Sequence, residues 1–142
     1  RVNKLGVPSF VFSREEFIAG VPILEKLAEY DVCLIVLAGF MNKISDVILQ
    51  AFPGKIVNIH PALLPKYGGK GMYGMHVHEA VVKAGERESG ITIHYINEHY
   101  DEGAIIFQAS CPVLPSDTPE EVASKVHALE YAHYPHVIES LL

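Results

Sequence analysis

Residues 32–37 read VCLIVL and residues 55–60 read KIVNIH, and these two runs decide the fold. The first run is entirely apolar, which is typical of a central strand that is covered on both faces, as in parallel sheets. Ser45 can cap a short helix through Ala51, and Pro53-Gly54 ends that helix before the second run. The order strand, helix, strand predicts a right-handed βαβ crossover with two parallel strands.

The segments around this unit predict further helices and an antiparallel hairpin. Residues 13–16 (SREE) have the S-x-x-E form of a capping box, and residues 118–121 (TPEE) add a proline at the first helical position of a helix that should reach about His133. A short connection joins two more strands at residues 91–96 and 104–109, which favours a hairpin. We therefore expect residues 1–142 to form one three-layer, Rossmann-like α/β domain with a mostly parallel sheet and a C-terminal antiparallel hairpin.

Composition excludes several classes of protein. The 142 residues include 11 Lys+Arg and 17 Asp+Glu, for a net charge of −6, and 49% of them are hydrophobic. Scattered basic residues that are outnumbered by acidic ones argue against a nucleic-acid partner. The longest apolar run, residues 32–38, is far shorter than the roughly 20 residues of a membrane span, so we expect no membrane partner. Cys33 and Cys111 lack metal-type spacing and fit a reducing, cytoplasmic compartment.

A polar pair stands at the end of the second run, where open α/β sheets place their ligand sites. Asn58 and His60 are two positions apart, so both side chains point to one face of an extended strand. An amide that stabilises an oxyanion and an imidazole that transfers a proton together suit acyl transfer. A purely structural pair, hydrogen-bonded at a turn, fits the same spacing. Asp101, in the loop between the last two predicted strands, would favour the imidazolium form of His60 if it lay beside that ring.

Eight histidines raise the question of a metal site. His76 and His78 would diverge on a helix, and His127 and His133 lie too far apart for the usual ligand spacing, so we expect no metal. Residues 66–75 contain four glycines, which is typical of a loop that lies against a ligand or folds over it. The dinucleotide fingerprint, the P-loop and the serine-hydrolase elbow are absent from the sequence.

Three segments in order resemble the phosphoribosylglycinamide formyltransferase family, the folate-dependent transferases of purine synthesis. They are LAGFM at residues 37–41, NIHPALLPKY at residues 58–67, and His94 followed by Asp101. The resemblance covers essentially the whole chain. It implies transfer of a formyl group from 10-formyltetrahydrofolate to the amine of glycinamide ribonucleotide by direct attack. In this scheme Asn58 would hold the formyl oxygen, His60 would act as general acid toward the folate nitrogen, and Asp101 would favour protonated His60 and help to order water.

The resemblance also implies ligand contacts. Folate would lie along Met41, Asn42, Lys43 and Ile44, with Arg14 near its carboxylate-bearing end. Glu130 would contact the ribonucleotide, and His127 stands where the family often has a longer polar side chain. We expect formylfolate and glycinamide ribonucleotide as small-molecule partners, no metal, and a monomer or weak homodimer.

The chain departs from the family pattern at several points. Asn42 stands where many members have an arginine. The chain also begins after the family's first βαβ segment, whose loop binds the ribonucleotide phosphate at a helix N-terminus. We therefore expect an N-terminally incomplete fragment, the C-terminal two-thirds of a formyltransferase domain. Two alternatives stay open: another formyltransferase or deformylase that acts on formylfolate, and a catalytically silent folate-binding module.

Overall fold

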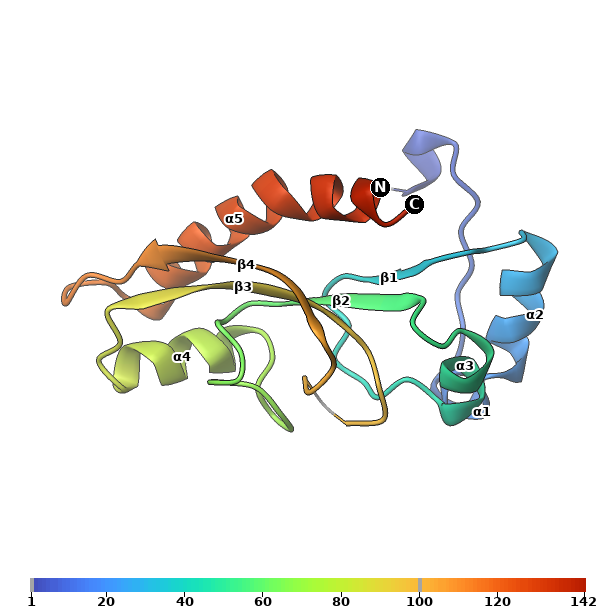
Figure 1. The fold of residues 1–142 in the computed structure, drawn as a ribbon, viewed down its shortest axis with the longest axis horizontal. Coiled ribbons are helices and arrows are strands. Elements are labelled where there is room, and N and C mark those ends of the chain that lie inside the picture. The colour runs from blue at the N-terminus through green and yellow to red at the C-terminus, as the bar shows by residue number, and fades with distance from the viewer. Residues whose placement is uncertain (1, 100) are drawn as a thin grey trace.

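The computed structural model describes residues 2–99 and 101–142. A short 3-10 helix at Val2–Leu5 precedes nine further elements of this part of the chain, which Figure 1 labels. In chain order they are α1 (Arg14–Ala19), α2 (Val21–Glu29), β1 (Ile35–Leu37), α3 (Asp46–Ala51), β2 (Ile56–His60), α4 (Met75–Lys83), β3 (Glu88–Tyr95), β4 (Ile105–Pro112) and α5 (Pro119–Ser140).

The described strands form one mixed sheet in the order β1-β2-β3-β4. β1 and β2 are parallel and are joined through α3, which confirms the predicted strand–helix–strand unit, and β3 and β4 form the predicted antiparallel hairpin. The α/β class is confirmed, but the described sheet has fewer parallel strand pairs than we expect from the sequence, because β2 and β3 are also antiparallel. His60, the last residue of β2, pairs with Thr92, and Val57 near the start of β2 pairs with Tyr95, the last residue of β3. The chain between them, including α4, therefore returns at the same end of the sheet instead of crossing back over it.

β1 is shorter and more exposed than its sequence predicts. It covers only Ile35–Leu37 and lies at the edge of the described sheet. Ile35 and Leu37 pack against α2 and α3, whereas Val36 points to the opposite face and is 38% exposed. Within the described residues β1 therefore has a neighbouring strand on the β2 side alone, and it is not buried on both faces as the apolar run predicts.

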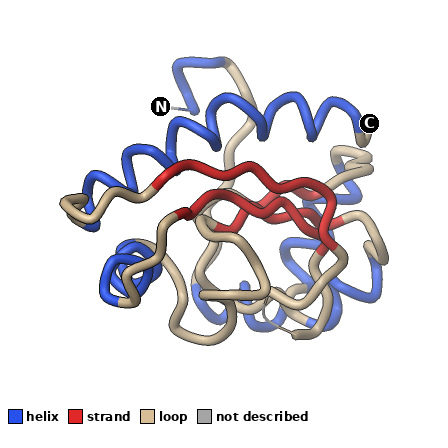
Figure 2. The backbone as a smooth tube through the Cα atoms, turned by 60° about the vertical axis from the view of Figure 1, so that its left-hand side comes forward, coloured by secondary structure: helices blue, strands red, loops and turns tan. Residues whose placement is uncertain are grey.

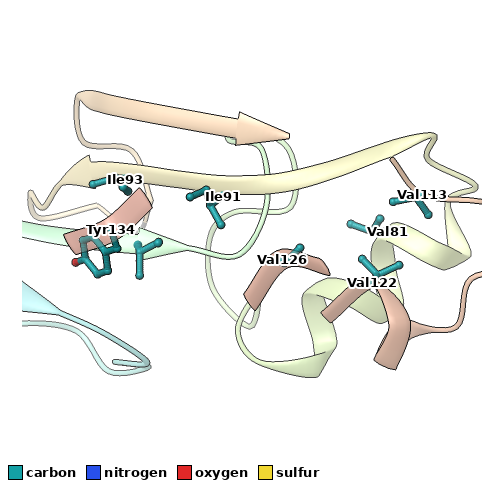
Figure 3. Close-up of a cluster of buried hydrophobic side chains, with 8 residues drawn as sticks. Val81, Ile91, Ile93, Val113, Val122, Val126 and Tyr134 are labelled. Carbon is teal, nitrogen blue, oxygen red and sulfur yellow. The ribbon is translucent and has the colours of Figure 1, made fainter. Parts of the chain in front are cut away.

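Helices cover both faces of the sheet, as the three-layer prediction requires. Ile56 and Ile59 in β2 are three positions apart and so face opposite sides. Ile59 belongs to a core in which β3 packs against α5, drawn in Figure 3, and Ile56 belongs to a second core formed with Ile44 and Ile48. Figure 2 shows the long C-terminal helix on one side of the strands and other helices on the opposite side.

Helix starts follow the predicted local chemistry, but one helix end does not. The Ser13 hydroxyl accepts from the amide of Glu16 and the Glu16 carboxylate accepts from the amide of Ser13, which completes the capping box. Thr118 caps α5 in the same region that we predicted. α5 continues through Pro135 to Ser140, whereas we expected it to end near His133. Proline removes one helical hydrogen bond, and side chains on both sides of Pro135, Tyr134 and Val137, pack on the core and keep the helix continuous.

Candidate functional site

Two polar side chains project side by side from the end of β2. Asn58 is 9% exposed and His60 is 3% exposed, although the neighbouring cleft reaches both. The antiparallel register places Asn58 opposite His94 and His60 opposite Thr92. Strand alternation thus gathers these polar groups on one face, while Ile59 points into the opposite core.

Asp101 joins this pair from the loop between β3 and β4. Its Oδ1 lies 3.7 Å from Nδ1 of His60 and 3.6 Å from Nε2 of His94. Its Oδ2 accepts a hydrogen bond of 2.9 Å from the amide of Gly69. The structure therefore brings Asn58, His60 and Asp101 into one cluster, the arrangement on which the sequence-based hypothesis depended.

His94, which the sequence analysis named only as part of the family motif, is a further member of the cluster. Its ring is fully buried; Nδ1 lies 3.0 Å from the carbonyl oxygen of Tyr95, and Nε2 lies 3.4 Å from Nδ2 of Asn58. Burial lowers the pKa of His94, although the Tyr95 carbonyl and Asp101 act in the opposite direction. In the neutral ring that donates from Nδ1 to Tyr95, Nε2 can accept from the Asn58 amide, which fixes how that amide points.

The Asn58 amide keeps hydrogen-bonding capacity for a ligand. Its NH₂ group has two hydrogens, and His94 accounts for one. Its Oδ1 is buried and has no hydrogen-bond partner among the described residues. Buried polar atoms normally have a hydrogen-bond partner. An unpartnered one at the edge of a cleft therefore indicates a place where a ligand or a water molecule supplies the missing hydrogen bond.

The cluster opens onto a cleft of about 710 Å³, which is in the size range of small-molecule sites. Nine of the ten predicted site residues line it, and Arg14, at the start of α1, does not. The nine are Met41, Asn42, Lys43, Ile44, Asn58, His60, Asp101, His127 and Glu130.

α4 and α5 add ionisable groups to the far wall of this cleft. Burial raises the pKa of Glu130, and the nearby His127 opposes this shift. His78 contacts His127 edge to face, with ring centroids 6.4 Å apart. Burial lowers the pKa of His78, and repulsion by His127 and His60 lowers it further. Within the described residues no group of three or more His, Cys, Asp or Glu side chains has the geometry to hold a metal ion.

The buried neutral histidines predict that acid destabilises the fold. Both His78 and His94 have a folded-state pKa below the ordinary 6.5, so just below that pH the unfolded chain binds more protons than the folded one. Their contribution to stability is therefore complete above pH 6.5 and is lost as the pH falls below it. Urea unfolding of the wild type and of His78→Gln between neutral and mildly acid pH measures this. We expect a smaller pH slope for the variant, and the exposed His136→Gln should keep the wild-type slope. An unchanged slope in His78→Gln would contradict the assignment.

The mixed sheet, with helices on both faces and a polar cluster at its strand ends, places the chain among Rossmann-like α/β proteins. Its particular family follows from sequence comparison: the formyl transferase profile matches residues 2–138, and the chain belongs to this family. This confirms the family resemblance. No helix in the described part of the chain combines the length and apolar character that a membrane crossing needs.

Known relatives agree with this assignment. The chain is 42% identical to the chloroplastic phosphoribosylglycinamide formyltransferase of Arabidopsis thaliana, with 96% of this chain and 48% of the relative covered. It is 39% identical to the phosphoribosylglycinamide formyltransferase of Bacillus subtilis, with 100% of this chain and 72% of the relative covered. The crystal structure of the enzyme of that name from Streptococcus pneumoniae superposes with a TM-score of 0.88 at 36% identity and covers 99% of this chain and 77% of its own. The chain thus spans about half the length of the plant relative.

Proposed function

We propose that the protein transfers a formyl group from 10-formyltetrahydrofolate to the amine of glycinamide ribonucleotide, N1-(5-phosphoribosyl)glycinamide, in purine biosynthesis. Membership of the formyl transferase family and the names of the relatives support this choice of reaction. The observation that carries it is the convergence of Asn58, His60 and Asp101 beside one cleft. An amide donor, a proton carrier and a carboxylate around one space are the groups that acyl transfer needs.

Each residue of the cluster takes one task in this proposal. An N–H of Asn58 donates to the formyl oxygen as the amine attacks and negative charge develops there. His60 supplies the proton that the folate nitrogen needs when its bond to the formyl carbon breaks, and Asp101 stabilises the charged imidazolium before that transfer. The amine loses one proton overall, which balances the proton gained by the leaving nitrogen.

The hydrogen bonds of His60 indicate which ring nitrogen exchanges the proton. Nε2 lies 2.7 Å from the carbonyl oxygen of Tyr67, which can only accept, so Nε2 carries a hydrogen. Nδ1 faces Asp101 at 3.7 Å, a distance that leaves it without a close hydrogen-bond partner. We therefore assign the transferable proton to Nδ1.

The cleft walls suggest where each substrate lies. Met41, Asn42, Lys43 and Ile44 form one side, for the formylfolate co-substrate, and Glu130 and His127 belong to α5, for the ribonucleotide. Because Arg14 does not line the cleft, its contact with the folate carboxylates remains a prediction of the family resemblance. We propose no metal for the reaction, since the tasks above are all filled by side chains.

Three wider properties are also proposals. The residues 1–142 form the C-terminal two-thirds of a formyltransferase domain, which the 72% coverage of the Bacillus subtilis relative supports. Both cysteines are free, which is consistent with a reducing, cytoplasmic compartment. The protein acts as a monomer or weak homodimer, which light scattering over a concentration series can test.

A single-turnover assay with the full-length protein tests the proposed reaction. The protein is mixed with formyl-labelled 10-formyltetrahydrofolate and, separately, with glycinamide ribonucleotide, methionyl-tRNA or no acceptor. We expect label only in formylglycinamide ribonucleotide. Formate release without an acceptor would indicate a deformylase, label in the tRNA another formyltransferase, and ligand binding without any product a silent binding module. Each of these three results would contradict the proposal.

A further inference from the structure

One turn of the glycine-rich loop contacts both the imidazole and the carboxylate of the cluster. The carbonyl of Tyr67 accepts from Nε2 of His60 at 2.7 Å, and two residues later the amide of Gly69 donates to Oδ2 of Asp101 at 2.9 Å. We propose that residues 66–69 act as a backbone bracket that sets the position of His60 relative to Asp101, and that Glu86 is a positioning residue that anchors this bracket. The proposal deepens the proposed function and rests on it.

The backbone of the bracket has an uncommon conformation that its surroundings must maintain. Tyr67 has a φ of +57°, in the left-handed region that residues other than glycine rarely adopt. Gly69 has a φ of +94°, a value that glycine adopts without steric cost. Such strained residues persist only where neighbouring contacts hold them, and they concentrate at functional sites. The contacts that hold Tyr67 are therefore part of what orients the two reactive groups.

Glu86 supplies the contacts that hold Tyr67 from outside the cleft. Its Oε1 accepts from the hydroxyl of Tyr67 at 2.9 Å and from the ammonium of Lys66 at 3.2 Å. The Tyr67 hydrogen bond, followed by that of Lys66, lowers the pKa of Glu86, so this carboxylate is ionised near neutral pH. Hydrogen bonds to an ionised acceptor are stronger than neutral ones. Glu86 is not among the residues that line the cleft, so it can affect the reaction only through the bracket.

Gly68 lets the bracket approach Asp101 closely. A β-carbon at this position would lie 2.6 Å from Cδ2 of Leu64 and 3.2 Å from Cβ of Asp101. Leu64 is buried and cannot move aside freely, so any larger residue would push the turn away from the carboxylate. The requirement for glycine here is one of space, whereas at Gly69 it is one of backbone angle.

The spacing of the cluster makes this bracket important for proton transfer. Nδ1 of His60 and Oδ1 of Asp101 are 3.7 Å apart, just beyond hydrogen-bond distance. A shift of well under 1 Å closes or opens that contact, and misplacements of about 1 Å can cost an enzyme about 100-fold in rate. A turn that holds both partners at once controls this distance directly.

The test compares single-atom and side-chain changes at the anchor. Tyr67→Phe removes only the hydroxyl, and Glu86→Ala removes the acceptor. We expect each to lower kcat for formyl transfer by about 10-fold to 100-fold with KM little changed. The double variant should match Glu86→Ala, because that single change already removes the hydrogen bond with Tyr67 and also the Lys66 contact. Glu86→Gln, which keeps an acceptor for the Tyr67 hydroxyl, should restore most of kcat. Tyr30→Phe, at a tyrosine that does not line the cleft, is the matched control.

A readout that needs no activity separates the bracket from the proposed function. Nitrogen NMR of the His60 ring reports which nitrogen carries the hydrogen in the neutral form. We expect hydrogen on Nε2 in the wild type and in Tyr30→Phe, and a mixture of the two forms in Tyr67→Phe and Glu86→Ala. Wild-type ring spectra in both anchor variants would overturn the bracket even if the protein transfers formyl groups. Altered spectra in an inactive wild-type protein would support the bracket and reject the proposed function.

Discussion

Replacing His60 by alanine is expected to lower kcat for formyl transfer by about 10²-fold to 10⁴-fold, the usual contribution of a positioned general acid. His60 is 3% exposed and its Nδ1 faces Asp101 at 3.7 Å, so water does not easily reach the position from which the ring donates its proton. The leaving folate nitrogen would then depart unprotonated or wait for a proton from bulk water. Steady-state rates with both substrates saturating give kcat, and rapid-quench measurement of one turnover gives the rate of the chemical step.

The size of this loss depends on the fold of the variant being intact. His136→Ala, which changes an exposed histidine of α5 that does not line the cleft, should retain wild-type kcat. Urea unfolding of both variants shows whether His60→Ala keeps a folded core. Equal formyl transfer by His60→Ala and wild type would remove His60 from the mechanism.

Local chemistry explains why the helix starts could be predicted. Ser13 with Glu16, and Thr118 with the amide of Glu121, satisfy orphan amides through side chains only three positions away. Nothing distant in the sequence is needed for such a cap to form. The helix end at Ser140 is not predicted, because the packing of Tyr134 and Val137 on the hydrophobic core outweighs the single hydrogen bond that Pro135 removes.

The pairing of distant strands explains which features of the site cannot be predicted from the sequence. Spacing predicts that Asn58 and His60 share a face, and the structure places both beside the cleft. It does not predict that His94 lies opposite Asn58, because the register of two residues that are 36 positions apart depends on the whole β2–β3 pairing. The contact between Tyr67 and His60 cannot be predicted from the sequence either, because it uses a backbone carbonyl, which every residue has.

Replacing Asn58 by aspartate is expected to lower kcat by about 10²-fold to 10³-fold, as loss of an oxyanion donor does. The change keeps the shape of the side chain but replaces the NH₂ group by an acceptor, which would repel the developing oxyanion. The substrate carbonyl is neutral in the ground state, so KM should change much less than kcat.

The same variant distinguishes an electrostatic role from a packing role for Asn58. Nε2 of His94 lies 3.4 Å from Nδ2 of Asn58, so aspartate also removes a donor from that buried ring. If this loss mattered only for stability, Asn58→Asp would unfold at lower urea while keeping kcat, since packing acts on the ground state and the transition state alike. A fall in kcat at unchanged KM instead indicates that Asn58 stabilises the transition state, in which negative charge develops on the formyl oxygen. Asn3→Asp, at an exposed asparagine, controls for the added negative charge. If both variants lost activity equally, the overall charge and not an oxyanion contact would explain the result.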